Sequence, residues 1–338
     1  MVLSIGLEEK GYDIIIENGA LSKISSFVSP KGKTLILTDT GVPYEYPEAV
    51  LNSVNDGYVY KIEQGEGSKS FDSFKNILSF MAEKGFTRTD SLIAVGGGVV
   101  GDLGGFVASA YMRGISFYNV PTTLLSQLDS SIGGKVAIDL DGYKNIVGAF
   151  YQPKRVIIDP LTLKTLDKRQ KMAGLAEAIK MAMTSNYELF ELIESADSLD
   201  KVLETVIVEG LKIKKSVVEE DPYEKGLRKI LNFGHTIGHA HESHAGLGGL
   251  LHGECVAIGM VPMTTSSEAK ERLLKVLKKY DLPVNLDTDT DILLSYIKKD
   301  KKASGDKITV CLVENIGEYI LKEIYIEDLR KIIEGGRL

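Results

Sequence analysis

The stretch Leu92-Ile-Ala-Val-Gly-Gly-Gly-Val-Val-Gly-Asp102 joins a short apolar run directly to a glycine-rich turn. Gly96, Gly98 and Gly101 satisfy the pattern G-x-G-x-x-G, which in dinucleotide-binding domains lies between a strand and a helix. Glycines let backbone N–H groups approach a pyrophosphate, and the following helix N-terminus offers partial positive charge. A tight turn that only packs a helix on a strand would show the same pattern. Its position after an apolar run favours a phosphate-containing ligand.

One element of the usual dinucleotide site is missing from this stretch. About 20 residues further on, where such sites place an acidic residue, the chain has Thr122 and Thr123. Asp39, which follows the apolar run Thr34–Thr38, could hold a ribose instead. The sequence therefore predicts a variant dinucleotide site.

The residues on either side of the glycine turn alternate between strand and helix patterns. Six short apolar runs are typical of strands: Tyr12–Glu17, Thr34–Thr38, Tyr58–Ile62, Leu92–Val95, Phe117–Val120 and Val156–Ile158. Between them, Phe71–Lys84 has apolar residues at helical spacing. A strand, helix, strand order implies a parallel sheet with crossover helices. We therefore predict that residues 1–158 form an α/β, Rossmann-like domain that binds the nucleotide.

The pattern changes after Asp159. Five segments have helical periodicity: Lys168–Ser185, Glu188–Glu194, Leu199–Glu219, Arg228–His244 and Glu254–Leu274. Near the end of the chain, Ile308–Val313 and Glu318–Ile324 could pair as a hairpin across turn residues 315–317. Residues 159–338 are therefore expected to form a mostly α-helical domain.

All five histidines lie between His235 and His252. His235 and His239 are four residues apart on an expected helix and so share one face, and His252 follows the glycine-rich residues 246–249 and begins another helix. Imidazole is a common metal ligand, and a catalytic zinc takes three protein ligands. His241 and His244 are readily explained as a polar helix surface, whereas His235, His239 and His252 favour a metal site.

A carboxylate would complete such a site, although spacing alone does not identify it. Glu177 is a candidate because it lies in the small, apolar stretch Ala173–Ile179. Burying a carboxylate there is unfavourable unless it is paired or bound to metal. Lys180 lies three residues on, on the same helical face.

A second candidate phosphate site lies at Asp129-Ser-Ser-Ile-Gly-Gly-Lys135 and the following Lys144-Asn145. The paired glycines bring backbone close to a neighbour, and Lys135 and Lys144 could hold a phosphate as point charges. The alternative is a flexible surface loop with solvated lysines. Beside a dinucleotide turn, the binding role is favoured.

Composition excludes several other classes of protein. The 338 residues carry 40 basic and 47 acidic side chains, a net charge of −7, and neither half is basic, which argues against nucleic-acid binding. Cys255 and Cys311 cannot staple so large a fold, which fits a reducing cytoplasm. The most apolar stretch, Leu92–Met112, contains Asp102 and six glycines, so we expect no membrane span, and residues 1–11 do not resemble a signal peptide.

Several blocks of the sequence together resemble the 3-dehydroquinate synthase family. They are Gly96–Phe106, Pro121-Thr-Thr-Leu-Leu125, Asp129–Lys135, Lys144-Asn-Ile-Val-Gly-Ala-Phe-Tyr-Gln-Pro153, Ala176-Glu-Ala-Ile-Lys180, Leu231-Asn-Phe-Gly-His-Thr-Ile-Gly-His239 and Leu251-His-Gly-Glu254. The resemblance implies an enzyme that converts 3-deoxy-D-arabino-heptulosonate 7-phosphate into 3-dehydroquinate and phosphate. It also implies bound NAD, a divalent metal (zinc first, cobalt as the alternative), a cytoplasmic location and a homodimer.

The resemblance also implies roles for individual residues. Glu177, His235 and His252 would be the metal ligands, so His239 would instead serve the substrate and proton transfer, with Lys144, Asn145 and Lys180 as further catalytic residues. Substrate contacts would come from Arg113 (reaching the partner's site), Asp129, Lys135, Lys144, Asn145, Lys180, Arg228, Asn232, His239 and one of Lys301 and Lys302. NAD contacts would come from Asp39, Glu66, Lys69, Gly97, Gly98, Val99, Val100, Gly101, Asp102, Thr122, Thr123, Lys135, Lys144, Thr162, Leu163, Lys164 and Thr165.

The chain departs from the family pattern at three positions. Gln64 stands where the family has aspartate, while Glu66 and Lys69 are in place. Val136 and Asp139 replace the threonine and asparagine usual after the Gly-Gly-Lys. These departures concern details of NAD contact and of hydrogen bonding in the loop.

Other functions remain as alternatives. A different sugar-phosphate cyclase, or a metal- and NAD-dependent polyol or glycerol-phosphate dehydrogenase of the same fold, would combine the same cofactors. The block at 129–135 with Lys144 and Asn145 favours the synthase. A non-catalytic module with a structural metal is disfavoured because such zinc sites use four closed ligands, often cysteines.

Overall fold

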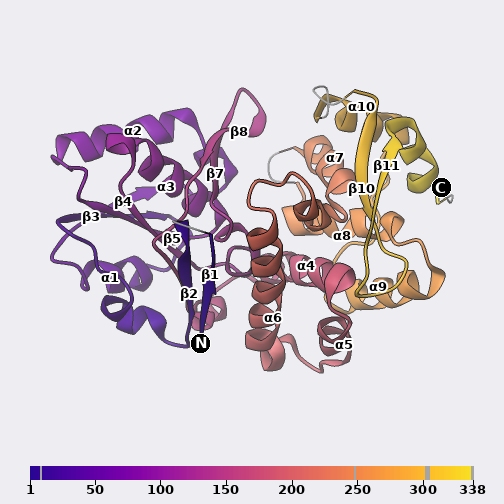
Figure 1. The fold of residues 1–338 in the computed structure, drawn as a ribbon, viewed down its shortest axis with the longest axis horizontal. Helices are drawn as coiled ribbons and strands as arrows, with labels where there is room; N and C mark the ends of the chain where they lie inside the picture. Colours follow the sequence, from indigo (N-terminus) through magenta and orange to yellow (C-terminus); the bar gives the residue numbers. More distant parts are fainter. Residues whose placement is uncertain (8–9, 247–248, 301–304, 336–338) are drawn as a thin grey trace. The chain divides into compact units, whose positions relative to one another are not determined.

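The computed structural model describes residues 1–7, 10–246, 249–300 and 305–335. The chain divides into two compact units, Met1–Asp167 and Lys168–Leu338 (Figure 1). The expected division lay after residue 158. Asp159 and the short turn after it belong to the first unit, because the Asp159 carboxylate accepts hydrogen bonds from the backbone N–H groups of Gly19 (2.9 Å) and Leu21 (3.1 Å).

The first unit is built on a seven-stranded sheet with strand order β1-β2-β9-β6-β5-β3-β4. These strands are β1 (Val2–Ile5), β2 (Tyr12–Ile16), β3 (Lys33–Asp39), β4 (Asp56–Ile62), β5 (Ser91–Gly96), β6 (Ser116–Pro121) and β9 (Arg155–Ile158). All adjacent pairs are parallel except β1 with β2. The six predicted strands and the parallel sheet are confirmed. The antiparallel edge strand β1, which is largely exposed, was not predicted.

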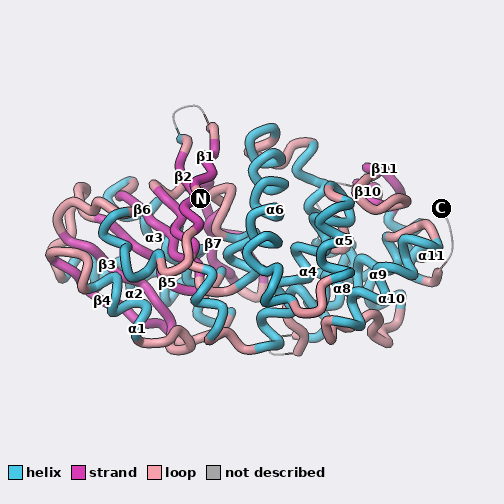
Figure 2. The backbone as a smooth tube through the Cα atoms, turned by 90° about the horizontal axis from the view of Figure 1, so that it is seen from below, coloured by secondary structure: helices cyan, strands magenta, loops and turns pink. Residues whose placement is uncertain are grey.

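Helices cover both faces of this sheet, namely α1 (Glu45–Leu51), α2 (Phe71–Glu83) and α3 (Gly98–Ala110) (Figure 2). Successive residues of β3 alternate between two cores: Leu35 packs in a cluster that includes residues of α2 and α3, and Ile36 packs in one that includes residues of α1. Burial on both faces explains why the strands have continuous apolar runs. The predicted helix at residues 71–84 is confirmed, and the Ser70 side chain caps it.

A two-stranded hairpin begins at Lys135 and includes Lys144 and Asn145, residues for which the sequence left a flexible surface loop as the alternative. Strands β7 (Lys135–Leu140) and β8 (Tyr143–Phe150) pair antiparallel from Lys135 opposite Phe150 to Leu140 opposite Tyr143. Asp141 and Gly142 form the two-residue turn and both have positive φ, as tight hairpin turns require. The hairpin is fixed to α3 by buried Val136 and Ile138 on alternate positions of β7.

The second unit is mostly helical, as predicted. Its helices are α4 (Lys168–Ser185), α5 (Tyr187–Ser195), α6 (Leu199–Glu220), α7 (His235–Ala245), α8 (His252–Met263), α9 (Ser267–Lys279), α10 (Thr290–Asp300) and α11 (Leu329–Ile333). The predicted hairpin is present as β10 (Lys307–Leu312) and β11 (Ile320–Tyr325). Within the ranges that the structure describes, no helix is long and apolar enough to cross a membrane.

Two predicted helices are wrong in length, because each is interrupted. The segment 228–244 begins as a short 3₁₀ helix, Leu227–Asn232, and α7 starts only after Gly234, whose φ of +76° no continuous helix contains. The segment 254–274 breaks after Met263, where Thr264 forms a β-bridge with Val313. Ser266 then caps α9 by accepting a hydrogen bond from the backbone N–H of Ala269 (3.1 Å).

Candidate active site

In the first unit, the glycine turn connects the end of β5 to the start of α3. Gly97 is extended, α3 begins at Gly98, and within the described residues no side chain caps this helix N-terminus. A Cβ on Gly97 would lie 3.1 Å from Cγ2 of Thr123, and one on Gly98 would lie 3.1 Å from Oγ of Ser130. The Ser130 hydroxyl is buried and, among the described residues, lacks a hydrogen-bond partner. A helix N-terminus without a side-chain cap and a buried hydroxyl without a partner among the described residues fit an anionic ligand here.

Close packing also requires some of these glycines, so the alternative explanation of the pattern is correct in part. A Cβ on Gly101 would lie 3.1 Å from the side-chain amide of Asn119 on β6. One on Gly104 would lie 3.1 Å from Leu92 on β5. The turn therefore combines tight helix–sheet packing with an open helix N-terminus.

Other predicted nucleotide residues lie at the carboxyl ends of the parallel strands, the edge where open α/β sheets bind ligands. Asp39 ends β3, and burial raises its pKa. Thr122 follows β6 and donates its backbone N–H to the carbonyl of Gly96 (2.9 Å). Thr162 follows β9, and its hydroxyl accepts a hydrogen bond from the side chain of Gln127 (3.0 Å).

Gln127 is a residue that the sequence analysis did not name. It is fully buried, and its amide nitrogen also contacts the carbonyls of Pro121 and Asp159, both at 3.1 Å. It thereby ties the loop after β6 to the turn that follows β9. Of the remaining predicted residues there, Leu163 is buried, Lys164 is exposed and the Thr165 hydroxyl bonds that of Tyr46 at 2.8 Å.

A charged cluster forms around Lys69, which is only 4% exposed. Its ammonium contacts Asp102 on α3 (2.6 Å), the side-chain oxygen of Asn145 on β8 and, more distantly, Glu66 (3.8 Å). Burial disfavours the ammonium, but Asp102 and Glu66 more than offset this and raise the pKa of Lys69. Burial raises the pKa of Asp102 to about 6, against the opposing effect of Lys69.

Asp139, one of the departures from the family pattern, holds this cluster in place. Its carboxylate accepts the backbone N–H of Asn145 at 2.8 Å, and its own N–H donates to the carbonyl of Lys69 at 2.7 Å. Asn145 has a φ of +56°, a conformation that asparagine tolerates better than most residues. The structure thus brings together Lys69 and Asp102, which were predicted to contact NAD, and Asn145, which was predicted to contact the substrate.

The remaining predicted cations of the first unit lie on its surface. Lys135 and Lys144 are exposed on β7 and β8. Arg113 is exposed at a sharp turn after α3, where both Met112 and Arg113 have positive φ. Asp129 lies in the turn of π-helix Ser126–Ser130 just before the hairpin.

In the second unit, three helices bring a carboxylate and imidazoles together. Glu177 on α4 is fully buried, and its Oε1 lies 3.7 Å from Nε2 of His235 on α7 and 3.5 Å from Nε2 of His252 on α8. Lys180 pairs with the other carboxylate oxygen. In the described part of the chain, neither oxygen of Glu177 has a hydrogen bond of acceptable geometry.

This donor set fits a divalent metal. A tetrahedral zinc with bonds of about 2.0–2.1 Å separates its ligand atoms by about 3.4 Å, close to the distances above. The Nδ1 atoms of both rings face away from Glu177, toward the carbonyl of Phe233 (3.1 Å from His235) and the carboxylate of Glu242 (3.1 Å from His252). Both Nε2 atoms are therefore directed at the carboxylate.

His239 lies beside the same group. One ring nitrogen from each of His235, His239 and His252 lies within 4.8 Å of the others, so a three-histidine set is also compact enough to hold a metal. Unlike Glu177, His239 is exposed. The structure thus brings together all four residues that sequence analysis named for the metal and its surroundings.

Burial and neighbouring charges shift the pKa values of Glu177, His235 and His252 in the metal-free protein. Burial would raise the pKa of Glu177, but Lys180, His235 and His252 hold it well below its usual value. Burial and the nearby Lys180 hold the pKa of His235 well below its usual value, so its ring is neutral. Burial also favours a neutral His252, but Glu177 and Glu242 raise its pKa to about 10. A metal would take the place of that proton.

Glycines let the three helices approach closely enough for these contacts. A Cβ on Gly253, next to His252, would lie 1.8 Å from the backbone oxygen of Ala173 on α4. A Cβ on Gly259 of α8 would lie 2.0 Å from the backbone oxygen of Gly234, just before α7. The close approach of α4, α7 and α8 thus depends on missing side chains.

Two further predicted residues lie just before α7. Arg228 is buried and donates to the carbonyl of Pro222 (2.8 Å). The Asn232 side chain donates to the carboxylate of Glu224 (2.9 Å), a residue that sequence analysis missed and whose φ of +57° marks a special turn. Lys301 and Lys302 lie outside the described residues.

The two histidines assigned to a polar surface differ from each other. His244 is exposed, as expected. His241 is buried, which contradicts that expectation, and its Nδ1 lies 3.4 Å from the Thr288 hydroxyl. Helical periodicity places His241 on the face opposite His239, and α7 packs against α10, just before which Thr288 lies.

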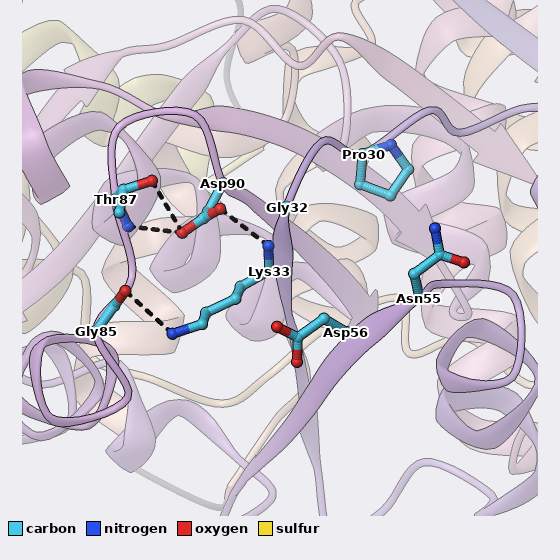
Figure 3. Close-up of a pocket in the computed structure, with 8 residues that line it drawn as sticks. All are labelled: Pro30, Gly32, Lys33, Asn55, Asp56, Gly85, Thr87 and Asp90. Carbon is cyan, nitrogen blue, oxygen red and sulfur yellow. Dashed lines mark hydrogen bonds between the residues drawn. The ribbon is translucent and has the colours of Figure 1, made fainter.

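A surface pocket of about 450 Å³ lies at the other edge of the sheet, where β3, β4 and β5 begin (Figure 3). Asp90 accepts hydrogen bonds from the backbone N–H groups of Lys33 (2.9 Å) and Thr87 (2.6 Å), and Lys33 donates to the carbonyl of Gly85 (3.2 Å). These bonds join the turns that precede the strands. None of the predicted site residues lines this pocket, so it is not the candidate active site.

Comparison with known proteins agrees with this arrangement. The family described as 3-dehydroquinate synthase N-terminal matches residues 59–173, and 3-dehydroquinate synthase C-terminal matches residues 174–303. A 3-dehydroquinate synthase of Enterococcus faecalis is 42% identical across 99% of this chain and 100% of the relative.

Solved structures of related cyclases have the same fold over their whole length. A 2-deoxy-scyllo-inosose synthase complexed with carbaglucose-6-phosphate, NAD+ and Co2+ is 25% identical with a TM-score of 0.87, and each chain is fully covered. A 2-epi-5-epi-valiolone synthase from Streptomyces hygroscopicus subsp. jinggangensis 5008 with NAD+ and Zn2+ bound is also 25% identical with a TM-score of 0.87, covering 97% of each chain.

Proposed function

The chain belongs to the 3-dehydroquinate synthase family, and from this premise we propose that it converts 3-deoxy-D-arabino-heptulosonate 7-phosphate into 3-dehydroquinate and phosphate. This is a lyase reaction of the shikimate pathway, which leads to aromatic amino acids. The observation that carries the proposal is the convergence of Glu177, His235 and His252 in a chain about 40% identical to curated synthases along its whole length.

Glu177, His235 and His252 would hold the metal, with zinc as the first expectation and cobalt as the alternative. The support is that both Nε2 atoms face a fully buried carboxylate that lacks hydrogen bonds of acceptable geometry within the described residues. Lys180 already pairs with Oε2, so Oε1, which lies near both Nε2 atoms, is the oxygen that would bind a metal. Exposed His239 is then available to the substrate as a proton-transfer group.

The first unit would hold NAD. The uncapped N-terminus of α3 would receive the pyrophosphate, with the backbone of Gly97, Gly98 and Gly101 close to it. The hydroxyls of Thr122, Thr123, Thr162 and Thr165, the backbone of residues 163–164, and Asp39, Glu66, Lys69 and Asp102 would complete the nucleotide contacts.

Substrate contacts would come from polar groups in each unit. In the first unit these are Asp129, Lys135, Lys144 and Asn145. In the second they are Lys180, Arg228, Asn232 and His239, with Lys301 or Lys302 as a further phosphate contact. The exposed lysines suit a phosphate that leaves, because a mobile ammonium stabilises developing negative charge wherever it forms.

When bound, NAD supplies a transient oxidation of the sugar, and the metal lowers the pKa of the reacting hydroxyl and polarises the carbonyl formed from it. The side chains of this protein would position the substrate and stabilise the charges that form during the reaction. Lys180 offsets the charge of Glu177 at the metal ligands. His239 would accept or return a proton at the sugar hydroxyl, and Lys135 with Lys144 would stabilise the departing phosphate.

We also propose that the protein is a cytoplasmic homodimer. Arg113 is exposed, and within the described residues it has no ion pair. A left-handed backbone at Met112 and Arg113 projects this turn from the end of α3. Arg113 would reach the substrate phosphate of the partner subunit.

The test is phosphate release from the heptulosonate phosphate in the presence of NAD and zinc. We expect turnover that a chelator abolishes and zinc restores. Glu177→Gln should lower the rate by more than the roughly 10–100-fold that loss of an outer ligand partner costs. Glu194→Gln, which removes one charge from the Glu194–Arg272 pair of the same unit, is the matched control and should keep its rate.

The same assay separates this activity from that of other cyclases. A hexose 6-phosphate should release no phosphate above background. Turnover of a hexose 6-phosphate in place of the heptulosonate, or a normal rate in Glu177→Gln, would contradict the proposal.

A further inference from the structure

Glu242, on α7, is a carboxylate to which the sequence analysis gave no role. Its Oε2 lies 3.1 Å from Nδ1 of His252, at the start of α8, and its side chain is 16% exposed. We infer that Glu242 is a positioning residue of the metal site: it accepts a hydrogen bond from Nδ1 of His252 and so directs Nε2 of that ring at the metal.

The geometry around the ring supports this role. Nε2 of His252 lies 3.5 Å from Oε1 of Glu177, on the opposite side of the imidazole from Glu242. A neutral imidazole carries one N–H, and a strong acceptor at Nδ1 keeps that hydrogen there and leaves Nε2 as the metal donor. The carboxylate also raises the basicity of Nε2, because it accepts the hydrogen bond from Nδ1–H of the same ring. Nε2 therefore binds a metal more strongly.

The other imidazole ligand has a matching arrangement. Nδ1 of His235 lies 3.1 Å from the backbone carbonyl of Phe233. That acceptor is part of the main chain, so its place depends on the backbone before α7. For His252 the acceptor is a side chain on another helix, and this is the orientation that a single substitution can remove.

The position of Glu242 within α7 is not explained by helix stability. It lies in the last turn of this helix, which ends at Ala245. A negative charge near a helix C-terminus is unfavourable, because the exposed carbonyl groups there carry partial negative charge. The contact with His252 gives the carboxylate a reason to occupy this position.

This inference rests on the proposed metal site, and zinc affinity tests it without substrate or NAD. The full-length protein would be stripped of metal and titrated with zinc against a chromophoric chelator. We expect Glu242→Ala to weaken zinc binding about 10–100-fold, as loss of an outer partner of a ligating histidine does. Glu242→Gln keeps an acceptor oxygen and should restore most of that loss.

Two controls separate positioning from a general loss of structure. Glu194→Ala removes the Glu194–Arg272 pair at a distance from the histidines, and should lower the melting temperature of the metal-free protein without weakening zinc binding. Metal-free Glu242→Ala should melt as a folded protein.

The outcomes distinguish the inference from the proposed function. If the unaltered protein binds zinc and Glu242→Ala binds it equally well, Glu242 has no positioning role and the inference is wrong. If the unaltered protein fails to bind zinc or cobalt at all, the proposed metal site is wrong. Equal weakening in Glu242→Ala and Glu242→Gln would also overturn the inference, because an acceptor oxygen at this position would then not restore zinc binding.

Discussion

Several side chains of this protein carry charge in places where burial opposes it. Lys69, Glu177 and Lys180 are all buried, and each is next to a group of opposite charge. An isolated charge would be too costly at these positions, whereas a paired charge can stay ionised there. An ionised side chain of this kind can also bind a charged ligand. Shifted pKa values such as those of Lys69 and Glu177 are typical of functional sites.

Asp102 gives a pH dependence that can be measured. Its pKa in the folded chain is about 6, above the usual 3.8, because it is buried. Between these pH values the folded chain holds a proton on Asp102 that the unfolded chain releases, so unfolding becomes easier as the pH rises. The contribution of Asp102 to the free energy of unfolding is therefore fully present below pH 4 and is lost as the pH rises through 6. Relative to Asp102→Asn, the wild type should lose about 1 kcal/mol of unfolding free energy between pH 5 and pH 7.

The measurement is urea unfolding of both metal-free and NAD-free proteins at several pH values across that interval. The difference between the two midpoints, scaled by the slopes, gives the change. A difference that stays constant with pH would show that Asp102 does not titrate near 6.

At the scale of elements, the metal site depends on how closely α4, α7 and α8 pack. Residues of the histidine-rich segment lie near one another along the chain, but Glu177 reaches them only because α4 contacts α8. Small residues at the crossing make that contact possible, and Gly253 meets the backbone of α4 directly.

Gly253→Ala tests this dependence. In an exposed helix this change would stabilise by about 1 kcal/mol, because alanine is the better helix former. Here the new Cβ would lie 1.8 Å from the oxygen of Ala173, so we expect destabilisation of about 1–3 kcal/mol and weaker zinc binding. Thermal unfolding and zinc titration would measure both effects.

A matched control is Gly67→Ala, where a Cβ would meet nothing within 4 Å. Its stability should stay within about 0.5 kcal/mol of wild type. Stabilisation by Gly253→Ala would mean that the helices are not in contact there.

At the scale of the whole molecule, the proposed reaction returns NAD to its original state. The protein should therefore release many phosphates per NAD, and absorbance at 340 nm should show no accumulating NADH during steady turnover. A polyol or glycerol-phosphate dehydrogenase would instead form NADH in proportion to product. Stoichiometric NADH with the heptulosonate phosphate, or with glycerol phosphate, would assign the chain to the dehydrogenase alternative.

The chain by itself determined features that depend on residues close together in sequence. The strand and helix patterns of the first unit, the glycine turn at 96–101 and the sharing of a face by His235 and His239 follow from local periodicity and backbone freedom. Local pattern failed where a distant contact overrides it: Thr264 pairs with Val313 and ends a helix. The hairpin of β7 and β8, which packs on α3, was not predicted.

Only the tertiary structure shows that Glu177 and Glu242 both lie beside His252. Spacing alone did not identify Glu177, although its apolar surroundings and the family resemblance pointed to it, and no sequence feature pointed to Glu242. Both contacts form between separate helices. Glycines such as Gly253 and Gly259 at the helix crossings allow the helices to come close enough for these contacts. How closely two helices pack depends on the shapes of both helix surfaces, and the residues of those surfaces are far apart in the sequence. The spacing of residues along the chain therefore does not predict such contacts.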